Sequence, residues 1–146
     1  MSAPSHTVLG MYHPWRDLRG RGAVALRWSS LPSPLRAVTD GACVWMHDRL
    51  SQAERRSVLT HELVHLDAGD ETCQPEAVER AVDQEAARRL VALDALVDAL
   101  LWSQDETEMA EELWVDVPTL VARIEGLTEA ERDHVEAALA RREEAL

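Results

Sequence analysis

The chain has 146 residues, of which 46% are hydrophobic, and it carries a formal net charge of −12. This length favours a single domain, residues 1–146, with one buried core. The charge is uneven, because residues 1–60 hold eight Arg and four acidic residues whereas residues 61–146 hold seven Arg and 23 acidic residues. The acidic part argues against direct binding of nucleic acid, whose phosphates it would repel, and favours a basic protein surface as a partner.

Several features of the sequence predict a cytoplasmic protein. No apolar run reaches the ~18 residues that a membrane span needs, and the first ten residues lack the basic start and apolar core of a signal peptide. Cys43 and Cys73 are too few for a disulfide framework and too far apart for a Cys-x-x-Cys metal site, so we expect reduced thiols. All 15 basic residues are Arg, which is typical of the GC-rich genome of a bacterium or its phage. We therefore expect the cytoplasm of a bacterial or phage-infected cell.

The first third of the chain predicts a small sheet. Residues 23–28 alternate between apolar and polar or small side chains, which is typical of a half-buried strand, and residues 42–47 predict a second strand. We expect the two strands to be antiparallel, with a proline-containing loop at 29–34 between them. The expected fold class is α+β, with a short antiparallel sheet in residues 1–50 followed by helices in 51–102 and in a C-terminal region, 103–146.

Helix signals follow the predicted strands. Ser51 and Glu54 have the form of a capping box that opens a helix over 51–67, and Gly69 offers a C-terminal stop. Thr128 and Glu131 form a second capping box. The apolar stretch 93–102 is compatible with continuation of the helix before it. The other predicted helices cover residues 75–91, 106–113, 117–124 and 129–142.

The first predicted helix contains a His-Glu-x-x-His motif at His61, Glu62 and His65. Residues four apart lie about 40° apart around a helix axis and about 6 Å apart along it, so both imidazoles can bind one metal ion. Glu62 lies about 100° further round, where it is a poor third ligand but is well aimed at a water on that metal. Imidazoles suit Zn²⁺, and a neighbouring carboxylate can transfer a proton. The motif predicts a zinc hydrolase, with peptidase as the leading class, over a helix with two incidental histidines.

A third ligand must come from elsewhere, because a catalytic zinc usually has three protein ligands and a water. The extended motif His-Glu-x-x-His-x-x-Gly-x-x-His is absent, since Ala68 and Glu71 stand at the positions of its Gly and last His. A carboxylate of the following helix is therefore the better candidate. That helix offers Glu76, Glu79, Asp83 and Glu85.

The sequence His-Glu-Leu-Val-His at 61–65, followed by Glu-Arg-Ala-Val-Asp at 79–83 and by residues 86–91, resembles the ImmA/IrrE family of zinc peptidases. In that family a Glu, with an Asn or Asp four residues later, opens a helix that closes in an apolar run. The resemblance covers about residues 45–95 and implies a zincin-like fold. It also implies Glu79 as the third zinc ligand and Asp83 as the hydrogen-bond partner of a ligand imidazole.

Physical chemistry agrees with this assignment, because residues 79 and 83 lie one helical turn apart and ligand histidines usually donate their other N–H to a carboxylate. The chain departs from the family where Glu85-Ala86 replaces Phe-Ala, and where residues 90–93, Leu-Val-Ala-Leu, replace the family's Leu-Leu-Met-Pro ending and so lack its Pro. These departures leave the alignment open by about a turn. Glu85 and Glu76 therefore remain alternative third ligands.

The resemblance implies a zinc-dependent endopeptidase that cleaves a helix-turn-helix repressor of a phage, mobile element or stress response. Glu62 would act as general base on the attacking water and then as proton donor to the leaving amine. The substrate would be the DNA-binding protein and not DNA, and the acidic residues 105–146 are the expected docking surface.

Two other classes of function stay open at this point. In the first, a zinc-containing regulatory protein inactivates a repressor by contact, without proteolysis. In the second, the zinc site is purely structural, which leaves Glu62 without a role.

A peptidase also needs a hydrogen-bond donor that stabilises the oxyanion of the transition state. The sequence offers five candidates for this donor and does not choose among them: Tyr12, His13, His47, Arg88 and His134.

Overall fold

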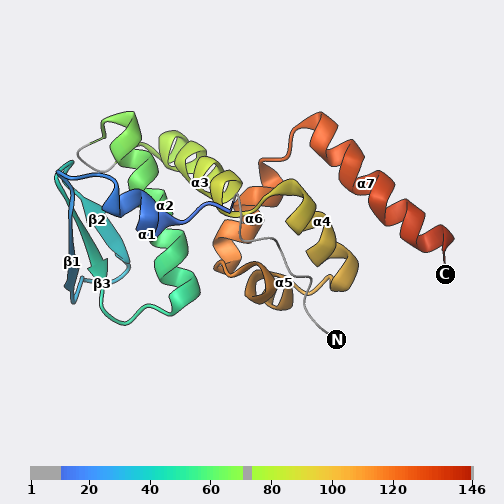
Figure 1. The fold of residues 1–146 in the computed structure, drawn as a ribbon, viewed down its shortest axis with the longest axis horizontal. Helices are drawn as coiled ribbons and strands as arrows, with labels where there is room; N and C mark the ends of the chain where they lie inside the picture. The colour runs from blue at the N-terminus through green and yellow to red at the C-terminus, as the bar shows by residue number, and fades with distance from the viewer. Residues whose placement is uncertain (1–10, 71–73, 146) are drawn as a thin grey trace.

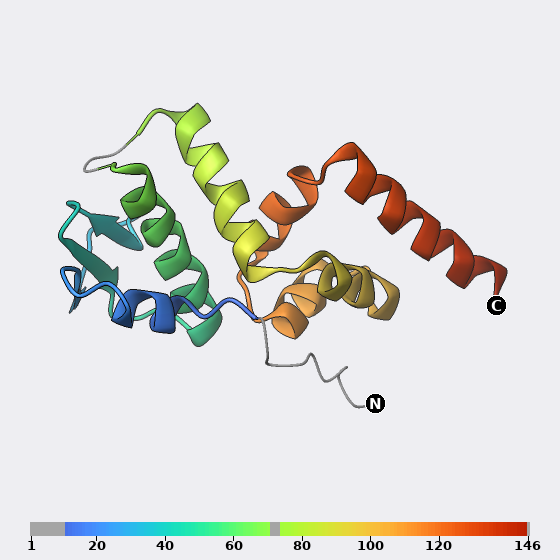
Figure 2. The same ribbon diagram turned by 45° about the horizontal axis from the view of Figure 1, so that its top comes forward.

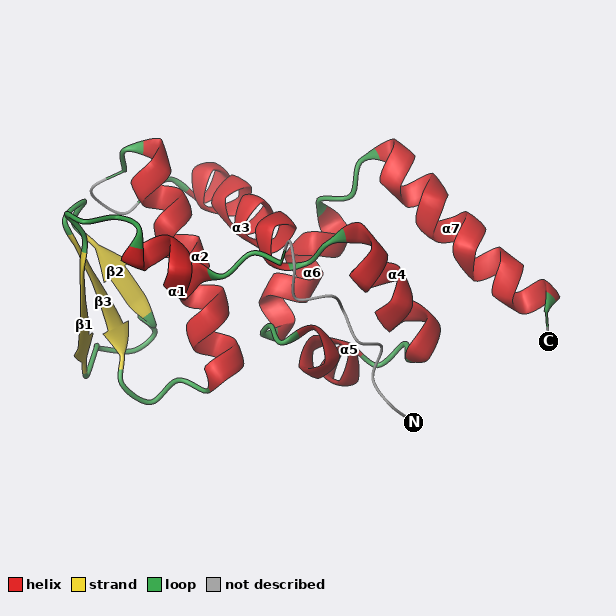
Figure 3. Cartoon of the chain, viewed as in Figure 1, coloured by secondary structure: helices red, strands yellow, loops and turns green. Residues whose placement is uncertain are grey.

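The computed structural model describes residues 11–70 and 74–145 and has an α+β fold that is mostly helical (Figures 1 and 3). Cys43 is a buried free thiol, whereas Cys73 lies outside the described residues. No helix within the described ranges is long and apolar enough to cross a membrane. The elements in chain order are α1 (Pro14–Arg19), β1 (Ala25–Ser29), β2 (Ala37–Thr39), β3 (Cys43–His47), α2 (Gln52–Ala68), α3 (Glu76–Leu90), α4 (Leu93–Trp102), α5 (Glu106–Leu113), α6 (Val117–Glu125) and α7 (Glu129–Glu144).

The sheet is mixed, so the prediction of a purely antiparallel sheet was wrong. Its strand order is β1-β3-β2, with β1 parallel to β3 and β2 antiparallel to β3. The reason lies in the turn before β3, where Asp40 Oδ1 accepts hydrogen bonds from the N–H groups of Ala42 and Cys43 and Gly41 has a φ of 92°. A reversal this tight pairs β3 with the residues just before the turn, which form β2. The predicted first strand is left to pair with the other edge of β3.

Helix α2 packs its apolar stripe against this sheet. Leu59 and Leu63 have no exposed surface and contact Val44 and Met46 of β3, which are equally buried. The predicted capping box is present, since Ser51 Oγ accepts from the N–H of residue 54 and Ser51 N–H donates to that residue's side chain. Because the apolar stripe faces the sheet, the two motif histidines lie on a different face of α2, toward α3.

The helices α4 to α7 form two apolar clusters on the side of α3 away from the sheet. One joins α4, α5 and α6 to the end of α3, and the other joins α4 to α7, which extends outward (Figure 2). The stretch 93–102 does not continue α3. Val91 between them has φ −123° and ψ 100°, and its carbonyl oxygen accepts a 2.7 Å hydrogen bond from Nε of Arg123. This bond satisfies a carbonyl at the end of α3 that a continued helix would have paired.

Arg123 is only 3% exposed and also donates from Nη2 to Oε2 of Glu131 at 3.0 Å. The capping box predicted at Thr128 is present, and it involves the same Glu131 side chain. The hydrogen bond from Arg123, together with that from the Thr128 N–H, lowers the pKa of Glu131 to about 2. One carboxylate thus joins the ends of α3 and α6 to the start of α7.

Acid is expected to weaken this junction. Because the pKa of Glu131 is lower in the folded chain than its ordinary value of 4.5, its stabilising effect is complete above about pH 5 and is lost as the pH falls toward 2. We expect Glu131→Gln to lower the free energy of unfolding by about 1 kcal/mol at pH 7, after allowance for solvent screening, and by almost nothing near pH 2. Urea unfolding at pH 7, 5 and 2 measures this difference. Glu129→Gln, at an exposed position of the same helix, is the control, and equal pH dependence in both variants would contradict the role of Glu131.

Candidate metal centre

His61, His65 and Glu79 come together where α2 and α3 lie side by side (Figures 1 and 2). The Nε2 atoms of His61 and His65 lie 3.1 and 3.0 Å from the same oxygen, Oε2 of Glu79. All three donor atoms lie within 4.8 Å of one another. The two helices pack here through a small apolar cluster of Val64, Val82 and Ala86. The structure therefore brings together the three residues that the sequence predicts as ligands.

Two of the separations between these donor atoms are close to those found around a tetrahedral metal ion. With metal–ligand bonds of 2.0–2.1 Å, two ligand atoms of a tetrahedral zinc lie about 3.3 Å apart. The observed separations of 3.1 and 3.0 Å from Glu79 Oε2 are close to that value. Two imidazole nitrogens and one carboxylate oxygen also match the donor sets of catalytic zinc sites, which keep a fourth position for water. The group can hold a metal ion, and its donors are of the kind that zinc prefers.

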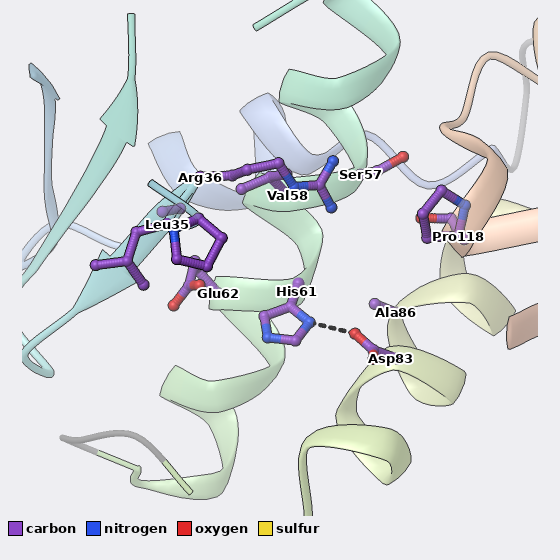
Figure 4. Close-up of a pocket in the computed structure, with 12 residues that line it drawn as sticks. Leu35, Arg36, Ser57, Val58, His61, Glu62, Asp83, Ala86 and Pro118 are labelled. Atoms are coloured by element: carbon purple, nitrogen blue, oxygen red, sulfur yellow. Dashed lines mark hydrogen bonds and ion pairs between the residues drawn. The ribbon is translucent and has the colours of Figure 1, made fainter. Parts of the chain in front are cut away.

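A further carboxylate orients each imidazole. Nδ1 of His61 lies 2.7 Å from Oδ1 of Asp83, and Nδ1 of His65 lies 2.9 Å from Oδ2 of Asp70. An ionised carboxylate can only accept, so Nδ1 carries the proton in both rings and Nε2 is the nitrogen that faces Glu79. Figure 4 shows the contact between His61 and Asp83. Asp83 thus lies where the family resemblance implies.

Asp70 is a site residue that the sequence prediction missed. Gly69 ends α2 with a φ of 78°, and the Asp70 N–H then donates to the carbonyl oxygen of His65 at 2.9 Å. This cap turns the chain back over the last turn of the helix and brings the Asp70 side chain to His65. The signal was present in the sequence as an Asp directly after the predicted stop glycine.

Glu62 is 6% exposed and lines a cleft of about 200 Å³ beside His61 (Figure 4). Burial raises the pKa of its carboxyl, and so does the charge of Glu79, while His61 and His65 act in the opposite direction. A carboxylate with a raised pKa is a better proton acceptor near neutral pH than an exposed one. The arrangement places a base next to the candidate metal ligands without making it a ligand.

The surroundings of His61 favour positive charge. Burial by itself lowers the pKa of the imidazole, but the hydrogen bond with Asp83 and the charges of Glu62, Asp83 and Glu79 outweigh it and raise the pKa above 6.5. The same carboxylates would attract a divalent cation to the donor atoms.

The alternative third ligands point elsewhere. Glu85 pairs with Arg89 at 3.1 Å, and Glu76 is 90% exposed at its side chain and pairs with Arg80 at 3.5 Å. Of the candidate oxyanion donors, none is among the described residues that line the cleft with Glu62. The Tyr12 hydroxyl donates a hydrogen bond to Asp17, and the Arg88 guanidinium donates to Gly126 and Glu131. The His47 ring accepts a hydrogen bond from the N–H of Arg49. His13 lines a separate cavity, and His134 is exposed at the surface of α7.

No protein-family model, curated protein or solved structure matches the chain. The resemblance to the ImmA/IrrE family therefore rests on residues 61–65, 79–83 and 86–91 of the sequence. The first two of these segments contribute side chains to the candidate metal centre.

Removing either orienting carboxylate is expected to weaken metal binding about 10–100-fold. The loss should be larger for Asp70→Asn than for Asp83→Asn, because the Asp70 side chain is 17% exposed and that of Asp83 is 54% exposed. A zinc titration with a competing chelating dye measures both dissociation constants. Asp94→Asn, on the neighbouring helix α4 and away from the centre, should bind zinc as the wild type does. Wild-type affinity in both Asp70→Asn and Asp83→Asn would show that these carboxylates do not support the ligands.

Proposed function

We propose that the protein is a zinc-dependent endopeptidase with a zincin-like active site. The observation that carries this proposal is the convergence of His61 Nε2 and His65 Nε2 on one oxygen of Glu79, with the buried carboxylate of Glu62 in the adjoining cleft. A structural metal site would need the three ligands but would have no use for Glu62.

The proposed chemistry divides between the metal and the chain. Bound at this centre, zinc supplies a Lewis acid that polarises a peptide carbonyl and lowers the pKa of water. Glu62 accepts a proton from the attacking water and delivers it to the amine that leaves. Asp83 and Asp70 keep the proton of each ligand imidazole on Nδ1, so that both Nε2 atoms stay directed at the centre.

For the substrate, we propose a helix-turn-helix repressor in the cytoplasm of a bacterial or phage-infected cell. Support comes from the sequence resemblance to the ImmA/IrrE family and from the charge of the chain, because an acidic protein suits a basic, DNA-binding partner. The proposed docking surface is the C-terminal segment, residues 105–146, in which α5 and α7 carry most of the acidic side chains. In α7 only Val135 and Ala138 are buried, so most of its charged side chains face solvent.

A contact mechanism without proteolysis is the second candidate function. It would use the same metal centre to hold α2 and α3 together and would present the acidic helices to the repressor. The buried position of Glu62 favours proteolysis, because a carboxylate without a chemical role costs free energy to bury.

Metal removal tests the proposed activity directly. Zinc-loaded protein is incubated with a peptide library made from a bacterial proteome, and new amino termini are identified by mass spectrometry. We expect cleavage by the zinc-loaded protein, loss of cleavage after treatment with a chelator, and recovery when zinc is returned. A library left intact by the zinc-loaded protein would exclude the endopeptidase.

A further inference from the structure

The cleft beside the metal centre contains an arginine that the chemistry described above does not use. Among the described residues that line the cleft, Arg36 is the only Arg, and it lies with His61 and Glu62 around the same space. Figure 4 shows its guanidinium above His61, between the Glu62 side of the cleft and Pro118. Its side chain is 41% exposed, which leaves it accessible to a bound molecule.

Arg36 is held in this position at both ends. Its carbonyl oxygen accepts from the His47 N–H at 2.8 Å, which fixes the backbone just before β2. Its Nη1 donates to Oδ2 of Asp116 at 2.8 Å, and Glu54 lies 3.7 Å from the same nitrogen. An arginine anchored in this way keeps less rotational freedom than one on an open surface, so its remaining donors have a fixed direction.

Asp116 is a rigid anchor for that guanidinium. Its side chain is buried, with 9% of the residue exposed, and it caps the start of α6 by accepting a hydrogen bond from the Thr119 N–H at 2.9 Å. The backbone N–H of Asp116 donates a hydrogen bond to Oγ of Ser57 at 3.1 Å. The anchor therefore connects α6 to the face of α2 that precedes His61. Arg36 joins β2 to the same point.

The guanidinium keeps donors that no described residue uses. A guanidinium has five N–H groups, and within residues 11–70 and 74–145 no hydrogen bond is formed by Nη2 or Nε of Arg36. Charged donors that are held at the wall of a cleft are suited to stabilise negative charge that develops during a reaction. The five candidates named from the sequence lie outside the cleft, whereas Arg36 lies within it.

We propose that Arg36 is a catalytic residue that donates hydrogen bonds to the carbonyl oxygen of the peptide bond being cleaved. The inference rests on the proposed peptidase function. The attacking water forms a C–O bond while the carbonyl π electrons move onto oxygen, which becomes the oxyanion that Arg36 contacts, and Glu62 takes the proton. When the oxyanion collapses, the C–N bond breaks and the amine leaves with the proton held by Glu62. Asp116 acts as a positioning residue for Arg36.

The test combines turnover with the binding of a tetrahedral anion. Peptides found in the library are used for kinetics, and N-phosphoryl-leucyl-tryptophan is titrated calorimetrically into the zinc-loaded protein. For Arg36→Gln we expect kcat to fall about 10²-fold with little change in KM, and the phosphoryl dipeptide to bind about 10²-fold more weakly. Arg36→Lys should recover part of both losses, because Lys restores the positive charge but not the planar set of N–H donors of a guanidinium. Zinc content should be unchanged, because Arg36 contacts none of the metal ligands.

Matched variants separate this role from a structural one. Arg88 has a similar exposure, 42%, and a similar ion pair, with Glu131, but lies outside the cleft, so Arg88→Gln should keep kcat and the affinity for the phosphoryl dipeptide. Asp116→Asn should keep the helix cap, since Asn caps as well as Asp, yet lower kcat by loosening Arg36. Thermal melting of each variant shows whether it is folded.

Each outcome decides one of the two proposals. An Arg36→Gln protein with wild-type kcat or wild-type affinity for the phosphoryl dipeptide overturns the role of Arg36 and leaves the peptidase standing. A wild type that does not bind the phosphoryl dipeptide also overturns it. A wild type that binds this dipeptide through Arg36 but cleaves no peptide overturns the peptidase and keeps Arg36 as an anion donor of a binding site.

Discussion

Replacing Glu62 with Gln is expected to abolish peptide cleavage, by at least ~10³-fold in kcat, while leaving about one zinc per chain bound. Gln has nearly the same shape as Glu but cannot accept the proton of the attacking water. Because Glu62 contacts none of the donor atoms of His61, His65 or Glu79, its loss should not open the metal centre. Turnover of library peptides and elemental analysis of the same preparations measure the two effects.

The control for this variant is Asp67→Asn on the same helix. Asp67 is 41% exposed and pairs with Arg21 and Arg89 outside the cleft, so its loss should leave turnover unchanged. Equal cleavage by Glu62→Gln and wild type would mean that Glu62 is not the base. Full repression-relieving activity of Glu62→Gln in cells would favour inactivation of the repressor by contact.

Zinc content is expected to fall from about one per chain to near zero in His61→Ala and His65→Ala, and to decrease strongly in Glu79→Gln. Each change removes one of the three converging donor atoms, and the remaining two cannot complete a tetrahedral site. Proteins purified without added metal and dialysed together are compared by elemental analysis. The expected loss is several orders of magnitude in affinity, which makes this the largest change in binding among the variants considered.

Glu85→Gln provides the matched control, because it lies on α3 as Glu79 does but pairs with Arg89 at 3.1 Å. It should retain wild-type zinc. Loss of zinc in Glu85→Gln with retention in Glu79→Gln would reverse the assignment of the third ligand. A wild type that takes up no zinc, even when zinc is added back, would mean that the motif is incidental.

Local sequence determined the helix that carries the motif. Ser51 and Glu54 cap its start, Gly69 ends it, and the four-residue spacing of His61 and His65 sets both imidazoles on one face, since these effects depend on neighbours within a few positions. The same holds for the capping box at Thr128 and for α5, whose bounds match the prediction of 106–113. Short-range hydrogen bonds and helix geometry suffice to predict such features.

Only the tertiary structure decided how distant segments meet. The sheet is mixed because the Asp40–Gly41 turn assigns β2 to β3, and α1 forms at Pro14–Arg19, where no helix was predicted. These outcomes depend on which arrangement buries the most apolar surface over the whole chain, and no local window contains that information.

The candidate site shows the same division. His61, Glu62 and His65 follow from one helix, and Glu79 follows from the family resemblance. Arg36 lies more than twenty residues before the motif and reaches the cleft only because β2 pairs with β3 and because Asp116, from the far end of the chain, anchors its guanidinium. Long-range packing thus supplies the proposed transition-state donor, because no spacing along the sequence could place that charge beside Glu62.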